Sequence, residues 1–210
     1  MRLAHLIPAV AFLASTAVMH AAPVTYIEKF FGDVTIGSAT YNNKNITLTG
    51  VGNTSDITLQ SNSYEYLDDV TATFSISGGP SGTFNNKLDV YEDQTNTVDA
   101  LVGAGFASEL YGGYDIMGTS NPDAFATYDL AYSIGPVSGT SESNAGGSGF
   151  LDPTSKGLFT VDSVSGDTTF QAETTASAPS AVPEPSSLAL LGTGLCSAVA
   201  MARRKLARRS

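Results

Sequence analysis

The chain has 210 residues, of which 42% are hydrophobic and only 14% are charged, a composition typical of one ordinary globular domain. Between Pro23 and Val182 four lysines face 19 carboxylates, which leaves this body a formal charge of −15. Such a body repels the phosphate backbone of nucleic acids, and its lack of Arg, His, Cys and Trp excludes Ser-His-Asp and Cys-His catalysis and the usual zinc sites.

Residues 1–22 have the features of a secretory signal peptide. Arg2 supplies a positive start, residues 6–18 form an apolar stretch, and small residues follow it. We therefore expect the secretion machinery to export the chain and the mature protein to begin near Pro23. Export permits disulfides, but the single cysteine, Cys196, cannot form an internal bridge.

Alternating apolar and polar residues predict β-strands throughout the body, residues 23–173. The clearest run is 70–76, which ends at a Gly-Gly-Pro turn, and a longer run covers 124–134. Residues 97–106 carry only a weak helical pattern, because two glycines interrupt it. Shorter strand candidates are 33–37, 46–50, 56–60, 88–92, 158–162 and 168–173.

Many short strands separated by turn residues, without alternating helices, favour an all-β antiparallel sandwich or barrel over a parallel sheet. We predict an antiparallel β-sandwich of about eight strands. A body of about 150 residues can bury roughly 68 to 70% of the surface of its unfolded chain, which is enough without disulfides.

Three groups of acidic side chains stand out in the body. They are Glu65, Asp68 and Asp69; Asp89, Glu92 and Asp93; and Asp115 with Asp123. Calcium binds to oxygen-rich loops without His or Cys, so the second group is a candidate calcium site, although its spacing does not match a helix–loop–helix calcium motif. The alternative interpretation is a solvated acidic face, and we expect no other cofactor.

The same carboxylates leave a hydrolase open as an alternative. Two carboxyl groups about 5 to 9 Å apart can hydrolyse a glycosidic bond, but sequence spacing does not reveal that distance. With no Trp in the chain, Tyr91, Tyr111 and Tyr114 would have to provide the aromatic surfaces of a glycan site. We therefore expect a body that is not an enzyme, with a carboxylate-based glycan hydrolase as the last alternative.

The C-terminal part begins with residues 174–181, whose Ala, Ser, Thr and Pro content is typical of a linker. Pro183 and Pro185 then keep the chain extended, because proline lacks the N–H that a helix or central strand needs. Residues 188–202 carry no charge, and as a helix they would span only about 22 Å of a bilayer core of about 30 Å. This segment is predicted to be a single short transmembrane helix.

Five cations follow this apolar segment and are expected to stay on the cytoplasmic side, so that the acidic body faces outward. They are Arg203, Arg204, Lys205, Arg208 and Arg209. The predicted signal peptide and this cluster indicate the same topology independently.

Residues 182–210, with Pro183, Glu184 and Pro185 before a short apolar helix and an Arg cluster, resemble the PEP-CTERM sorting signal of Gram-negative bacteria. The resemblance implies that the tail is recognised and removed by an exosortase, a membrane-embedded cysteine peptidase, in organisms that make exopolysaccharide. It also implies that the Pro-Glu-Pro residues are a substrate motif with no catalytic role.

Together these patterns predict an exported, non-enzymatic protein, anchored briefly in the inner membrane and then located at the cell surface or in an extracellular polysaccharide matrix. Its expected partners are the secretion machinery, an exosortase and exopolysaccharide, and no nucleic acid. The first alternative is a calcium-dependent or glycan-binding adhesive module.

Overall fold

The computed structural model describes residues 21–61, 64–95, 102–108, 110, 114–142 and 151–175. These residues are 71% strand, so the expectation of an all-β body is confirmed. The expected signal peptide up to residue 20 lies outside the described residues, as do residues 176–210 with the sorting motif, the apolar segment and the Arg cluster. Within the described ranges, no helix is long and apolar enough to cross a bilayer.

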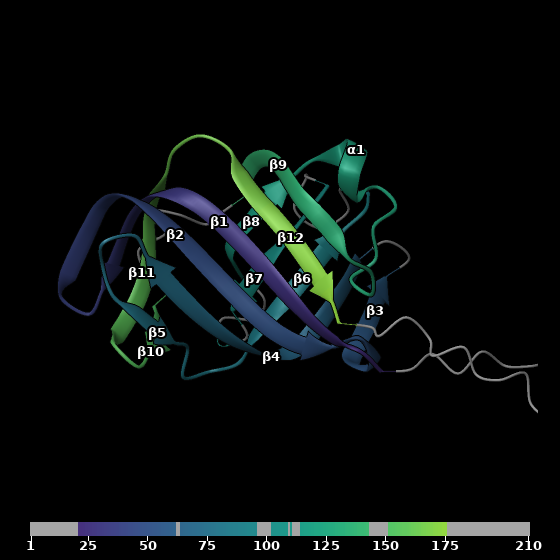
Figure 1. The fold of residues 1–210 in the computed structure, drawn as a ribbon, viewed down its shortest axis with the longest axis horizontal. Helices are drawn as coiled ribbons and strands as arrows, with labels where there is room; N and C mark the ends of the chain where they lie inside the picture. The colour runs from purple at the N-terminus through teal and green to yellow at the C-terminus, as the bar shows by residue number, and fades with distance from the viewer. Residues whose placement is uncertain are drawn as a thin grey trace, which may run out of the picture. The chain divides into compact units, whose positions relative to one another are not determined.

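Twelve strands and one short α-helix make up the described body (Figure 1). The first six strands are β1 (Pro23–Ile36), β2 (Ala39–Asn53), β3 (Ile57–Ser61), β4 (Tyr64–Ile76), β5 (Ser81–Thr83) and β6 (Leu88–Asp93). The others are β7 (Gly103–Ser108), β8 (Tyr114–Ser120), β9 (Ile134–Glu142), β10 (Asp152–Thr154), β11 (Gly157–Val164) and β12 (Thr168–Thr174). The helix α1 (Pro122–Phe125) lies between β8 and β9.

The sheet closes into an eight-stranded antiparallel barrel, and the predicted sandwich is wrong. The order β1-β12-β9-β8-β7-β6-β4-β2 returns to β1, because β1 pairs with β2 from Pro23 to Ile36 while its other edge pairs with β12 and β11. Figure 1 shows β2, β1 and β12 side by side. Inward and outward side chains alternate in a barrel as in a sandwich, so the alternation could not distinguish the two folds.

Strand β4 bends where its partners change. From Tyr64 to Val70 it pairs with β6, and its second half, from Thr71 to Ile76, pairs with the part of β2 from Ile46 to Val51. The register shifts between Leu67 and Val70, and Asp69 there has a φ of 61°. This bulge lets one long strand belong to both ends of the barrel.

The barrel interior differs between its two ends. At the end that contains the second halves of β1 and β4, Phe159 lies 5.4 Å from Phe74 and 5.3 Å from Phe84 between ring centroids. At the other end the inward positions include Glu28 of β1 and Glu92 of β6, both fully buried. The first end is therefore an aromatic core, and the second is a mixture of aromatic and carboxyl groups.

Two predicted elements are wrong. Residues 124–134 do not form one strand, because Asn121 caps a helix that starts at Pro122, and β9 begins only at Ile134. The apolar residues of this segment, Phe125 and Leu130, are fully buried in the core instead. The described part of 97–106 is not helical, since β7 begins at Gly103.

The other predicted strands are confirmed. The run 70–76 lies in β4, and 88–92 lies in β6. The candidates 33–37, 46–50, 56–60, 158–162 and 168–173 overlap β1, β2, β3, β11 and β12.

Candidate functional site

The three predicted calcium ligands lie on β6, on two opposite faces of the strand. Strand alternation directs Glu92 to the barrel interior, with Leu88 and Val90, and Asp89 and Asp93 to the opposite face. Asp93 instead accepts a hydrogen bond from the Thr95 N–H at 3.0 Å. Across the described residues, no three His, Cys, Asp or Glu side chains are grouped so that they could hold a metal ion.

The structure brings together Glu65 and Glu92, from two different acidic groups of the sequence, and Asp129, which belonged to none of them. Glu65 of β4 and Glu92 of β6 are cross-strand neighbours, and Asp129, which follows α1, acts on both electrostatically. Glu92 is fully buried, and neither of its carboxyl oxygens accepts a hydrogen bond. We call Glu65, Glu92 and Asp129 the acidic cluster.

Burial is the main cause of the electrostatics of this cluster. Burial, with the charges of Glu65, Asp93 and Asp129, raises the pKa of Glu92 to about 9, although the side chain of Gln94 acts in the opposite direction. Burial also raises the pKa of Glu65 and of Asp129, and a backbone N–H lowers each of them in part. Glu92 is therefore protonated and neutral at pH 7.

Glu28 of β1 is a second buried acid of the interior. Thr119 donates a hydrogen bond of 2.7 Å to its Oε1, while its Oε2 has no partner. Burial raises the pKa of Glu28 well above its usual range, against the hydrogen bond from Thr119. Thr119 and Thr168 also share a hydrogen bond of 2.6 Å. Hydrogen-bonded polar side chains therefore connect β1, β8 and β12 across the interior.

The segment after α1 is fastened to the acidic end of the barrel. The Tyr26 hydroxyl donates to the Leu130 carbonyl at 2.8 Å, and Gln94 Nε2 donates to the Tyr128 carbonyl at 2.6 Å. The rings of Phe125 and Tyr128 pack edge-on against Phe170, with centroids 5.8 and 6.2 Å away. These contacts fix the segment that carries Asp129 to Tyr26 of β1 and Phe170 of β12.

Glu92 is the one member of the acidic cluster that is fully buried, whereas Glu65 and Asp129 are partly exposed. A glycosidase needs both carboxyl groups next to the scissile bond, and Glu92 has no exposed surface through which a sugar could reach it. Of the expected aromatic surfaces, Tyr91 is buried and donates to Glu142, Tyr114 is exposed, and Tyr111 lies outside the described residues.

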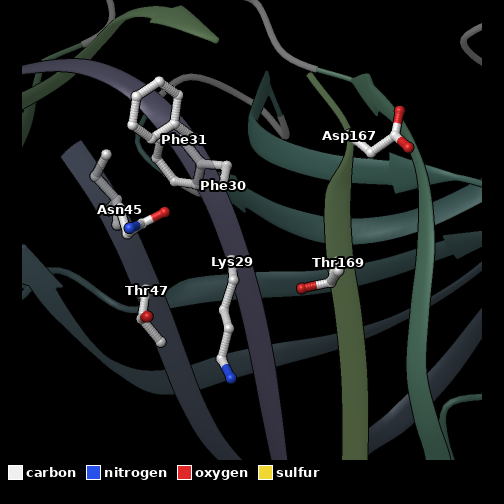
Figure 2. A pocket seen from close by; sticks show the side chains of 8 residues that line it. Lys29, Phe30, Phe31, Asn45, Thr47, Asp167 and Thr169 are labelled. Carbon is white, nitrogen blue, oxygen red and sulfur yellow. The ribbon is translucent and has the colours of Figure 1, made fainter. Parts of the chain in front are cut away.

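A shallow groove on the outer face of the barrel offers accessible groups instead. It crosses β2, β1 and β12, has a volume of about 270 Å³, and we call it the β1 groove (Figure 2). It is lined by Lys29, Phe30, Phe31, Asn45, Ile46, Thr47, Asp167 and Thr169. Phe30 and Ile46 are buried and belong to its floor, whereas the other side chains lie on the outer face.

Strand register explains how these side chains meet. Lys29 is the cross-strand neighbour of Thr47 on one side and of Thr169 on the other, and Phe31 is the neighbour of Asn45. Residues of one strand that are two positions apart share a face, so Lys29 and Phe31 point outward together. Figure 2 shows Lys29 of β1 between Thr47 of β2 and Thr169 of β12.

The comparisons with known proteins concern the tail. Residues 181–209 match the model of the PEP-CTERM protein-sorting motif. This confirms the resemblance seen in the sequence. Neither the curated proteins nor the solved structures include a match to this chain.

The motif indicates how the chain is sorted. A PEP-CTERM tail implies an exported protein, anchored transiently in the membrane, which an exosortase processes. The body that this tail carries is the closed barrel described above.

Sequence reasoning did not identify Glu28 or the β1 groove. Val24 and Tyr26 flank the polar Thr25 and give a partial signal of the buried face of β1, which the outward apolar residues Ile27 and Phe31 obscure. The groove has no such signal, because its residues come from three strands that are far apart in the chain.

Proposed function

We propose that the chain is a non-enzymatic structural or binding protein of the cell surface or of an extracellular polysaccharide matrix, released from its membrane anchor by exosortase. The match of residues 181–209 to the sorting motif carries this proposal. The body supports it, since its most perturbed acids, Glu28 and Glu92, are sealed in the interior where they cannot contact a substrate.

Processing of the tail tests the proposal. The intact mass of the protein recovered from the envelope or the medium should show loss of the residues after about Pro185. Replacing Pro183, Glu184 and Pro185 by alanine should leave the tail attached, because the recognition element is removed. A matched linker variant, Ser180→Ala, should still be processed.

Protein recovered from the envelope or the medium with its tail complete would contradict the proposal, and so would a body found in the cytosol of labelled cells. A processed protein from which polysaccharide-degrading activity co-purifies, and is lost on substitution of Glu65, would favour the hydrolase alternative.

A further inference from the structure

The β1 groove is a place where polar side chains remain without partners. Lys29, Asn45, Thr47, Asp167 and Thr169 form no side-chain hydrogen bond or ion pair within the described parts of the chain. Lys29, Asn45 and Asp167 are exposed, and the two threonines are half-buried. Their donors and acceptors are therefore satisfied only by water and are available to a ligand.

Polar side chains at the other end of the same outer face provide a comparison with the groove. At the other end of β1, Thr35 bonds Thr40 of β2 at 3.0 Å and donates to Asp162 of β11 at 2.7 Å. Polar side chains of neighbouring strands therefore pair with one another at that end. In the groove the equivalent neighbours Thr47, Lys29 and Thr169 do not.

Phe31 adds an apolar surface to this polar hollow. Its side chain is 38% exposed, although a phenylalanine is usually buried. Phe31 is the cross-strand neighbour of Asn45 on β2. A sugar ring has one face made of C–H groups and an edge of hydroxyls, so it can contact an aromatic ring and hydrogen-bond to amide and hydroxyl groups at the same time.

Charge and backbone pairing exclude other occupants. Lys29 and Asp167 balance each other locally, while the body's formal charge of −15 repels an anionic polymer. A peptide cannot add as a strand, because β1 already pairs with β2 and β12 on its two edges. One exposed aromatic ring is too little apolar surface for a hydrophobic protein partner.

We propose that the β1 groove binds a segment of an uncharged polysaccharide chain, with Phe31 against a sugar ring and Lys29, Asn45, Thr47 and Thr169 hydrogen-bonded to its hydroxyls. This inference deepens the proposed function and rests on it, since an exported body meets such polymers outside the cell. The groove is slightly smaller than pockets of about 300 to 1,000 Å³ that enclose small molecules, so it would hold only one or two sugars of a longer chain.

The test is affinity electrophoresis of the full-length chain in a mild detergent, in gels that contain dextran, soluble starch, galactomannan or alginate. We expect at least one of the three uncharged polymers to retard the protein and alginate not to retard it. Phe31→Ala should weaken the retardation constant about tenfold, which is about 1.4 kcal/mol, since the sugar removes only the exposed part of this side chain from water. The control Tyr132→Ala, which removes an aromatic residue that is 63% exposed elsewhere, should leave binding unchanged.

A second pair of variants keeps the test independent of Phe31. Thr47→Val with Thr169→Val removes two groove hydroxyls at nearly constant shape and should weaken binding several-fold, whereas Thr49→Val, on the same face of β2, should not. Thermal melting of each variant verifies the fold.

Three results would overturn the inference: no retardation by the uncharged polymers, stronger retardation by alginate, or full binding by both groove variants. None of these concerns the tail, so a processed, exported protein that fails to bind would retain the proposed function. An unprocessed protein that binds would instead contradict the proposed function alone.

Discussion

The two ends of the barrel interior bury different kinds of side chains. At one end Phe74, Phe84 and Phe159 pack against one another, and their contribution to stability does not depend on pH. At the other end Glu28 and Glu92 occupy positions of the same inward face, and burial raises the pKa of both carboxyl groups. The comparison indicates that the aromatic end provides stability and that the acidic end makes stability depend on pH.

The largest effect is expected at the aromatic end. Phe159→Ala removes a fully packed ring that contacts Phe74 and Phe84, and should lower the free energy of unfolding by about 3 to 5 kcal/mol. Denaturant unfolding measures the change. The neighbour Leu158, which is 44% exposed, is the control, and Leu158→Ala should cost little. Equal costs for the two variants would show that this end is not the main core.

At the acidic end we expect a change of intermediate size, which raises the free energy of unfolding where Phe159→Ala lowers it. Glu92 has a pKa of about 9 in the folded barrel and an ordinary value in the unfolded chain. Between these values the unfolded state binds fewer protons, so stability falls as pH rises toward 9, by at most about 1.4 kcal/mol per pH unit. Glu92→Gln should therefore raise the free energy of unfolding at pH 8 by roughly 2 kcal/mol and change it little at pH 4.

Urea unfolding across this pH range measures the difference in the free energy of unfolding between the wild type and the Glu92→Gln variant. Glu173→Gln, at an exposed position of β12, is the control and should keep the wild-type pH profile. If the Glu92→Gln variant followed the same pH profile as the wild type, Glu92 would not be the group that titrates.

The smallest effect is expected at a single hydrogen bond of the acidic end. Tyr26→Phe keeps the ring beside Phe170 but removes the hydrogen bond to the Leu130 carbonyl, which should cost about 1 kcal/mol. The segment after α1 should then exchange its amide hydrogens faster, as native-state hydrogen exchange would show. Tyr132→Phe, at an exposed position, should alter neither quantity, and unchanged exchange in the Tyr26→Phe variant would mean that other contacts hold the segment.

Local sequence patterns predicted much of the strand content and the sorting tail. The run 70–76 alternates because one face of β4 is buried and the other is solvated, and this pattern depends only on neighbours in the chain. The Pro-Glu-Pro motif and the Arg cluster are likewise linear features, which is why the match to residues 181–209 agrees with the sequence reading.

Long-range pairing determined the rest. The closure of β1 on β2 and β12 distinguishes a barrel from a sandwich, and it also places Lys29 between Thr47 and Thr169. The pairing of β4 with β6 places Glu65 beside Glu92. The residues around 124–134 alternate like a strand, yet the cap at Asn121 and burial against Phe170 produce a helix and a loop. A residue's face follows from the period of its own strand, whereas its neighbours, its burial and its pKa depend on strands that are distant in the chain.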